Sequence, residues 1–543
     1  MVVGVDLRLS TKMCSTRKGI RVTKYLLAGV TVFCVSWIAC VNEWNARSHW
    51  SPPQRRYSTM KTIVAYSDGK QAEMDRPSPV TCDRLPEYPV IPEINRTWSP
   101  HAAEALWQQV EGTPVSLYAA YYDERAPQHY VRVLAIFHGR NLSSLEDLFC
   151  QTRVLHDGGS VEVVAAKPLE IWWQDWDKST NDVDTPFLLS CPLTEPLNNR
   201  ADVSIVTEPC DNPTNGFHIV PKTNNKYQRS FTICVKDMNF QKDISPSLIE
   251  WIETNRLLGA EVIDFYVDNV HKNTEATLRR YQSQGLVRLF QVPIKNTARR
   301  SLWQRRRDHL VSYNDCLYRN ILETEFIVPL DVDEVLVPKI TYNWHGLLKR
   351  LPRQGWDPHH HSAILVRNVF FFDFMQHLHN NNKTSDNRNR VKLYMKRDDV
   401  RIDDEVLNEI FDLHSTEKEI NKHITEIERE RNDCTNNLDV PKLSRNIVSS
   451  ATISPIGYYS KSFMLTRKVL TAFNHYPLAS IGATGFTGWA APYKEVQLNH
   501  YKETCNFTMV PECAEYVKRS RIDRSALHLS RRLARAIANT ICK

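Results

Sequence analysis

Short apolar runs alternate with longer amphipathic runs between Phe231 and Leu330, and this alternation constrains the fold more than any other feature of the sequence. The pattern predicts strands at residues 231–235, 262–267, 286–292 and 326–330, and helices at residues 245–258, 274–283 and 305–322. Strands that alternate with helices require crossover connections, which give a mostly parallel sheet covered by helices on both faces. We therefore predict an α/β domain.

Polar side chains follow two of these predicted strands. Asp268 and Asn269 follow the second strand, whereas Asp331, Asp333 and Glu334 follow the fourth. Ligands of such sheets bind at the carboxyl ends of the strands. Carboxylates suit Mn²⁺ or Mg²⁺, which prefer hard oxygen ligands. A solvated turn is the better explanation of an isolated Asp-x-Asp, but the preceding apolar strand favours a metal site at Asp331 and Asp333.

A metal at this position fits transfer from a nucleotide sugar. Breaking the bond between the sugar and the diphosphate builds negative charge on the phosphates, and a divalent cation neutralises that charge as a Lewis acid. Glu334 is expected to support the loop through hydrogen bonds. Two interpretations of Asp268 are equally good: it accepts hydrogen bonds from uracil or ribose, or it caps a turn.

The charge distribution argues against nucleic acid as the main partner. Six basic residues and one acidic residue before Tyr25 supply +5 of the formal net charge of +7. A nearly neutral remainder lacks the basic surface that phosphate backbones require.

Residues 25–41 form an uncharged, largely apolar stretch that is just long enough to cross a bilayer. The basic residues before it place residues 1–24 in the cytoplasm and the rest of the chain in the lumen. We predict an uncleaved signal anchor rather than a cleaved signal peptide, because no clean small-residue cleavage site follows Val41. Prolines scattered through residues 42–110 indicate an extended stem.

Cysteines and glycosylation sequons support a lumenal location. Ten cysteines follow the predicted anchor, an even number that suits disulfides, although their pairing cannot be deduced. Four N-glycosylation sequons also lie on the predicted lumenal side, at Asn95, Asn141, Asn382 and Asn506.

Two folded parts and an insert are predicted after the stem. Residues 111–225 contain short β-favouring runs and indicate a small β-rich accessory module, followed by the α/β domain at residues 226–543. A charged stretch at about 398–437 predicts a helical insert. In the module, Trp172 belongs to a sugar-stacking surface or, more simply, to the core.

Basic and histidine clusters have simpler explanations than ligand binding. The arginines between Arg299 and Arg307 could screen a diphosphate, but a solvated helix face is the favoured interpretation. The run His359, His360 and His361 is interpreted as a solvated loop, because adjacent side chains on a regular element point in different directions.

The residues from Phe231 to Lys502, apart from the insert, resemble glycosyltransferase family 92. The resemblance is carried by residues 231–235, 248–250, 256–259, 314–319, 331–334 and 460–462, and by Tyr266, Asp268, Asn269, His500 and Tyr501. It implies a GT-A fold in a type II Golgi membrane protein that transfers a hexose with inversion. Known members add galactose to fucose on the N-glycan core, which implies UDP-galactose as the donor and a glycan or glycoprotein as the acceptor.

The resemblance also bears on single residues. It implies that His500 completes the metal site with Asp331 and Asp333, and that Asp268, Asn269 and Asp331 contact the nucleotide sugar; a structural histidine is the alternative for His500. The base that deprotonates the acceptor is not assigned, and Asp373 and Glu495 are no better supported than other acids nearby.

Two other functions are compatible with parts of this pattern. A lumenal lectin or chaperone that keeps the fold without catalysis would lack turnover of any nucleotide sugar. A nucleotidyltransferase is disfavoured by the anchor and the sequons, and because Lys236, Asp237 and Met238 stand where a glycine-rich phosphate loop is expected.

Overall fold

A computed structural model describes most of the chain after residue 77. The described ranges are 78–84, 86–100, 106–140, 142–155, 160–172, 182–221, 226–296, 300–380, 441–505, 515–516 and 519–542. The predicted cytoplasmic tail, anchor and charged insert lie outside them. Within these ranges, no helix is long and apolar enough to span a bilayer.

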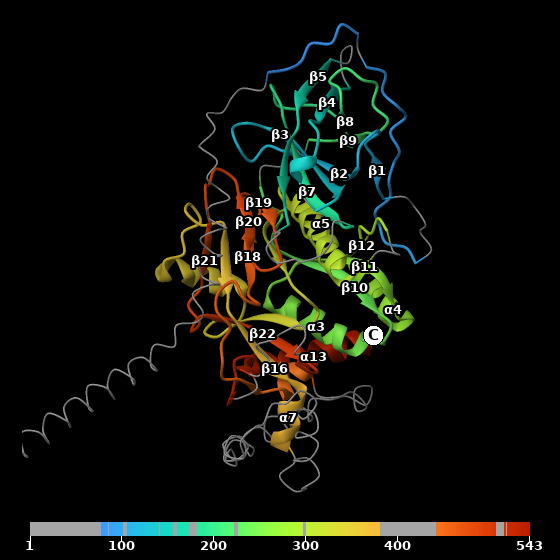
Figure 1. The fold of residues 1–543 in the computed structure, drawn as a ribbon. Coiled ribbons are helices and arrows are strands. Elements are labelled where there is room, and N and C mark those ends of the chain that lie inside the picture. Colours follow the sequence, from blue (N-terminus) through green and yellow to red (C-terminus); the bar gives the residue numbers. More distant parts are fainter. Residues whose placement is uncertain are drawn as a thin grey trace, which may run out of the picture. The chain divides into compact units, whose positions relative to one another are not determined.

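A seven-stranded mixed sheet forms the centre of the α/β domain (Figure 1). Its strands, in spatial order, are β12 (Val287–Gln291), β11 (Val262–Val270), β10 (Arg229–Phe240), β13 (Thr324–Pro329), β18 (Lys461–Leu465), β15 (Ala363–Val366) and β21 (Gly488–Ala490). The four strands predicted from the sequence are adjacent and parallel. The antiparallel strand β18 then joins β13 to β15.

The helices between the four parallel strands also match the prediction. They are α3 (Ser245–Leu258), α4 (Lys272–Ser283) and α5 (Leu302–Asn320). Helix α3 ends at Gly259, whose φ of 120° favours glycine. Its beginning differs in detail, because the Ser245 hydroxyl donates a hydrogen bond to Asp243 instead of capping the helix.

A three-stranded sheet carries the acidic loop away from the central sheet. It consists of β14 (Glu334–Pro338), β22 (Val496–Lys502) and β16 (Asn368–Phe372). In the antiparallel register of β14 and β22, Glu334 lies opposite His500. The strand pairing therefore brings residue 500 beside the acidic loop.

Residues 106–221 contain two antiparallel sheets, which agrees with the predicted β-rich module. One sheet has β1 (Gln108–Gln109), β2 (Val115–Asp123), β3 (Tyr130–His138), β7 (Asp184–Pro192) and β6 (Lys167–Glu170). The other has β5 (Val161–Ala165), β4 (Phe149–Val154), β8 (Ala201–Val206) and β9 (Phe217–Ile219). Trp172 is 4% exposed and packs on the Arg307 guanidinium, so the core interpretation of this tryptophan is correct.

Helix α5 contacts both the central sheet and the β-rich module. On the module side, the Tyr121 hydroxyl donates to the Asp315 carboxylate, and Arg307 donates to Thr185 Oγ1 at 2.7 Å. Arg125 of the module also donates to the carbonyl of Val469 at 2.7 Å. Polar side chains of the α/β domain that lie inside this contact thus depend on the module for their partners.

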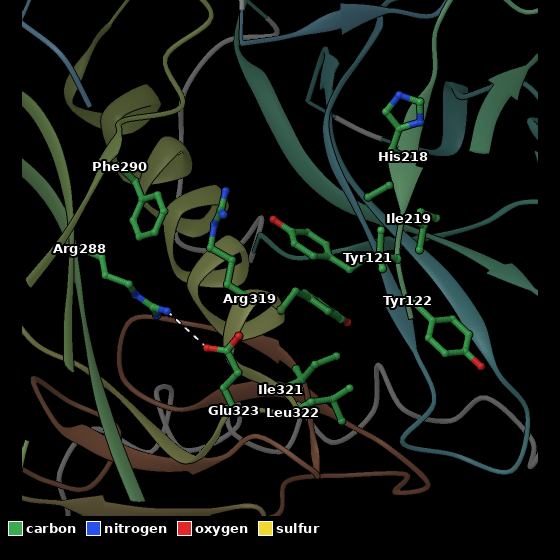
Figure 2. A pocket seen from close by; sticks show the side chains of 13 residues that line it. Tyr121, Tyr122, His218, Ile219, Arg288, Phe290, Arg319, Ile321, Leu322 and Glu323 are labelled. Atoms are coloured by element: carbon green, nitrogen blue, oxygen red, sulfur yellow. Dashed lines mark hydrogen bonds and ion pairs between the residues drawn. The ribbon is translucent and has the colours of Figure 1, made fainter. Parts of the chain in front are cut away.

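A pocket of about 270 Å³ opens beside this contact (Figure 2). Its walls include Tyr121 and His218 from the module and Arg288, Phe290 and Glu323 from the α/β domain. Arg288 pairs with Glu323 and with the buried Asp264, so the charges in the wall compensate one another.

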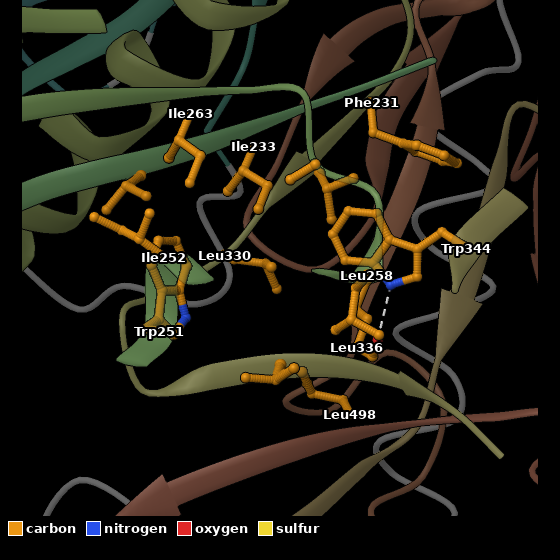
Figure 3. Packing of buried hydrophobic residues seen from close by; sticks show 14 of the residues in the cluster. Phe231, Ile233, Trp251, Ile252, Leu258, Ile263, Leu330, Leu336, Trp344 and Leu498 are labelled. Carbon is orange, nitrogen blue, oxygen red and sulfur yellow. Dashed lines mark hydrogen bonds between the residues drawn. The ribbon is translucent and has the colours of Figure 1, made fainter. Parts of the chain in front are cut away.

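The hydrophobic core lies between the central sheet, α3 and the three-stranded sheet (Figure 3). Phe231, Ile233 and Ile263 of the sheet are fully buried, as are Leu336 and Leu498 of β14 and β22. Two core tryptophans also hold backbone carbonyls near the acidic loop: Trp251 Nε1 donates to Glu334 and Trp344 Nε1 to Leu336, each at 2.8 Å. Core packing therefore fixes the backbone that follows the acidic loop.

The remaining elements are short or lie at the periphery. They are α6 (Trp344–Arg350), α7 (Asp373–Asn380), α11 (Lys442–Arg445), α13 (Ser530–Ile541), η1 (Leu142–Ser144), η4 (Leu351–Gln354), η7 (Leu527–Leu529), β17 (Val448–Ser450), β23 (Ser520–Ile522), β19 (Val469–Ala472) and β20 (Pro477–Ser480).

Disulfides join distant parts of the chain. Within the described ranges they link Cys82 to Cys210, Cys150 to Cys191 and Cys234 to Cys316, and Cys505 and Cys542 are also disulfide-bonded. The first of these ties residues 78–100, which fall within the expected stem, to the β-rich module. The same segment buries Trp98 to 3% exposure and has little regular structure.

Candidate active site

The acidic loop is a closed turn between β13 and β14. The Glu334 carboxylate accepts a hydrogen bond from the Asp331 backbone N–H at 2.9 Å, and the Glu334 N–H donates to the Asp331 carbonyl at 3.0 Å. Glu334 is 2% exposed, so it supports the loop from inside, as the sequence predicts. The Asp331 and Asp333 side chains stay 32% and 40% exposed.

Asp333 is paired with His500. His500 Nε2 lies 3.4 Å from Asp333 Oδ2, and His500 Nδ1 lies 3.6 Å from Glu334 Oε1 without making a hydrogen bond. The His500 ring stacks on Phe370 of β16, which fixes its orientation. Partial burial alone would raise the pKa of Asp333, but His500 outweighs it and lowers that pKa.

Asp331 is paired with two lysines instead. Lys236 Nζ lies 2.8 Å from Asp331 Oδ1 and 2.9 Å from Oδ2, whereas Lys461 Nζ lies 3.5 Å from Oδ2. Burial would raise the pKa of Asp331, yet the ammonium groups, Lys236 first, hold it well below its usual range. Lys461 also contacts Glu334 at 3.1 Å, and both lysines donate to Asn474 Oδ1.

The expected metal ligands are close together but are not arranged as a three-ligand site. Carboxylate and imidazole donors suit Mn²⁺, and Asp333 and His500 are adjacent and partly open to solvent. The Asp331 oxygens, however, contact Lys236. Among the described residues, no group of three or more His, Cys, Asp or Glu side chains has the arrangement of a metal site.

Asp268 belongs to a second cluster, at the carboxyl ends of β10 and β11. The Arg300 guanidinium contacts Asp268 at 2.9 Å, Asp237 at 3.0 Å and Asp308 at 3.1 Å. Burial raises the pKa of Asp268 and brings that of Asp308 to about 6, while Arg300 opposes both shifts. Asn269, the other expected nucleotide-binding residue, is exposed on β11.

Buried arginines around this cluster correct the interpretation of a solvated helix face. Arg300 has a side chain 10% exposed, and Arg307 is fully buried. Arg305 contacts Asp237 at 2.6 Å. They are buried because carboxylates of β10, β11 and α5, and Thr185 of the module, supply partners inside the fold.

His309 completes the surroundings of Asp237. Its Nε2 lies 3.1 Å from Asp237 Oδ2. Burial lowers the pKa of His309 to about 4, and the neighbouring carboxylate only partly offsets this. Asp237 in turn keeps a pKa of about 2, because His309 and the arginines outweigh its burial.

Neither acid considered as a base is available in this structure. Asp373 pairs with Lys442 at 2.8 Å, and Glu495 forms two contacts with Arg350, at 2.9 and 3.1 Å. Glu495 also precedes β22, whereas His500 lies toward the other end of that strand. The histidine run is a loop, as predicted, with His359 and His360 exposed.

Sequence reasoning missed Lys236 and Arg300 as parts of the site. Lys236 was considered only as a departure from a glycine-rich loop, although it follows the predicted strand 231–235 just as Asp331 follows 326–330. The rule that polar residues after parallel strands form the site would have included it.

The pocket beside the module lies at the opposite end of the parallel strands. Glu323 precedes β13 and Asp331 follows it, and a six-residue strand spans about 20 Å. The pocket and the acidic loop are therefore separate.

Comparison with known proteins identifies the family. A search of curated proteins finds no match. The profile described as glycosyltransferase family 92 matches residues 229–533, from the first residue of β10 into α13. This match covers more than half of the chain and includes the acidic loop, both lysines and His500. The chain therefore belongs to glycosyltransferase family 92.

Proposed function

We propose that the chain is a metal-dependent GT-A glycosyltransferase that moves a hexose with inversion from a nucleotide sugar to a glycan. UDP-galactose is the proposed donor, and fucose of the N-glycan core is the proposed acceptor. The protein is proposed to be a type II Golgi membrane protein with a lumenal catalytic domain. The family match supports glycosyl transfer, whereas donor, acceptor, metal and location are parts of the proposal.

The observation that carries the proposal is the pairing of Asp333 with His500 at the end of β13. A carboxylate and an imidazole lie 3.4 Å apart, both reach solvent, and each is fixed by buried neighbours. Mn²⁺ takes such donors readily. The pair stands at the carboxyl end of a parallel strand, where ligands of such sheets bind.

In this proposal, each residue around the loop has a defined task. Asp333 and His500, with Asp331, would hold the metal, which neutralises charge on the departing diphosphate when bound. Glu334 keeps the turn closed through its two hydrogen bonds with Asp331. Asp268, held by Arg300, stands where a ribose or uracil would be bound.

A donor screen of the full-length protein tests the proposal. The solubilised chain is incubated with UDP-sugars and N-glycan acceptors, with and without Mn²⁺, and products are identified by mass spectrometry. We expect transfer of a hexose only with metal. If the folded protein neither transfers nor hydrolyses any donor in the panel, the proposal is wrong, and a lectin or chaperone role replaces it.

A further inference from the structure

We propose that Lys236 competes with the divalent cation for Asp331, so that the metal binds weakly until a diphosphate is also present. This inference rests on the proposed function, because it concerns the metal of that reaction. It assigns to Lys236 a positioning role: the lysine holds the Asp331 carboxylate in the metal-free protein.

The contact geometry places Lys236 where a cation would bind. Its ammonium lies 2.8 Å and 2.9 Å from the two oxygens of Asp331, so one positive group contacts both ends of the carboxylate. A metal that used both oxygens would need the same position. The two cations therefore exclude each other at that side of Asp331, because like charges at such a distance repel strongly.

Of the two lysines, Lys236 is the one that can move. Lys461 is 1% exposed, and its ammonium has acceptors on Asp331, Glu334 and Asn474, which use its three donors. The Lys236 side chain is 14% exposed and has a second acceptor, Asn474 Oδ1, at 3.3 Å. Lys236 can thus leave Asp331 while keeping a partner.

The charge of the site explains why a diphosphate would be needed. Asp331, Asp333 and Glu334 bring three negative charges, and Lys236 and Lys461 offset two of them. Affinity for a hard divalent cation increases with the charge of its ligands. A diphosphate would add negative charge both for the metal and for the displaced ammonium. Metal and nucleotide are then expected to bind cooperatively, each strengthening the other by the same factor.

Manganese binding to the full-length protein tests the inference without any turnover. The free Mn²⁺ signal is titrated by electron paramagnetic resonance, with no nucleotide, with uridine or with UDP. For the unmodified protein we expect UDP, but not uridine, to tighten Mn²⁺ binding about tenfold or more. Equal Mn²⁺ affinity with and without UDP overturns the inference, and this measurement requires no variant.

Lys236→Met provides the sharper arm. Removal of the ammonium is expected to tighten nucleotide-free Mn²⁺ binding about tenfold and to reduce the effect of UDP. Lys236→Arg keeps the charge and should match the unmodified protein, as should Lys349→Met, which removes an exposed lysine on α6. An unchanged nucleotide-free affinity in folded Lys236→Met overturns the inference.

The outcome is separable from that of the proposed function. Absence of transfer with every donor, together with the expected Mn²⁺ behaviour, would reject the proposed function alone. Transfer that requires Mn²⁺, together with Mn²⁺ binding that ignores Lys236, would reject the competition alone.

Discussion

His500 lies opposite Glu334 in the pairing of β22 with β14, and from there its Nε2 reaches within 3.4 Å of Asp333 Oδ2. A residue at the start of β14 and one close to the C-terminal end of β22 thus become neighbours through strand register. This pair of side chains is the basis of the first two predictions.

Asp333→Asn should reduce transfer at least about 100-fold, because it removes the charge of a metal ligand at constant size. The side chain is 40% exposed, so stability should change by no more than about 1 kcal/mol. Initial rates and thermal unfolding are measured together. Asp357→Asn, which alters an exposed acid beside the histidine loop, serves as the control and should keep full activity. Normal turnover in Asp333→Asn would contradict the metal assignment.

His500→Gln should weaken Mn²⁺ binding about tenfold or more in the presence of UDP, because one of the few ligands is lost. Raising the Mn²⁺ concentration should then restore part of the transfer activity. His138→Gln, in the β-rich module, removes a histidine that is 42% exposed and should have no effect. Equal Mn²⁺ affinity in His500→Gln would favour a structural histidine.

Asp268→Asn should weaken UDP binding about tenfold, because a charge-assisted hydrogen bond to ribose or uracil becomes a neutral one. Calorimetric titration with UDP measures this loss. Mn²⁺ binding without nucleotide should stay the same, since Asp268 belongs to the Arg300 cluster rather than to the acidic loop. A UDP affinity equal to that of the unmodified protein would leave Asp268 as a turn residue.

His309 predicts a pH dependence of stability. Its pKa is about 4 in the folded protein and near 6.5 when unfolded, so the unfolded chain binds more protons between these values. The free energy of unfolding should therefore fall as the pH is lowered from 6.5 to 4, by up to about 3 kcal/mol from this group. In His309→Gln the slope over this range should be shallower, as followed by denaturant unfolding. An identical slope would show that His309 does not titrate in this way.

The disulfide between Cys234 of β10 and Cys316 of α5 should stabilise the α/β domain. It joins residues 82 positions apart, and replacing both cysteines with alanine should lower the free energy of unfolding by about 2–4 kcal/mol. Denaturant titration of the double variant measures the loss. Reducing the unmodified protein should produce a change in the same direction, and a double variant of full stability would show that the cross-link contributes little.

Local sequence patterns sufficed for the elements of the α/β domain. Gly259 ends α3 where the sequence predicts, and α3 itself has the predicted bounds of 245–258. Strand β10 is longer than predicted, because its polar end, beyond Val235, still pairs with β11 through a shift in register. Apolar periodicity cannot detect strand residues of this kind.

Contacts between side chains at the site depended on register, which the sequence does not reveal. Cys234 pairs with Pro329 in β10 and β13, so two residues further on Lys236 comes beside Asp331. The shift between β10 and β11 lets the next residue, Asp237, contact Arg300 instead. The acids were therefore predictable from their place after a strand, whereas their lysine and arginine partners were not.

The hydrogen bond from Tyr121 to Asp315 has a practical consequence for preparing this enzyme. The family profile begins at residue 229, which suggests a natural place to start a recombinant fragment. Such a fragment would lack Tyr121, Thr185 and Arg125, and would leave Asp315 and Arg307 short of partners at a newly wetted surface. Unmatched buried charges of this kind favour misfolding and aggregation. Expression should start before Cys82, so that the module and its cross-link to Cys210 are retained.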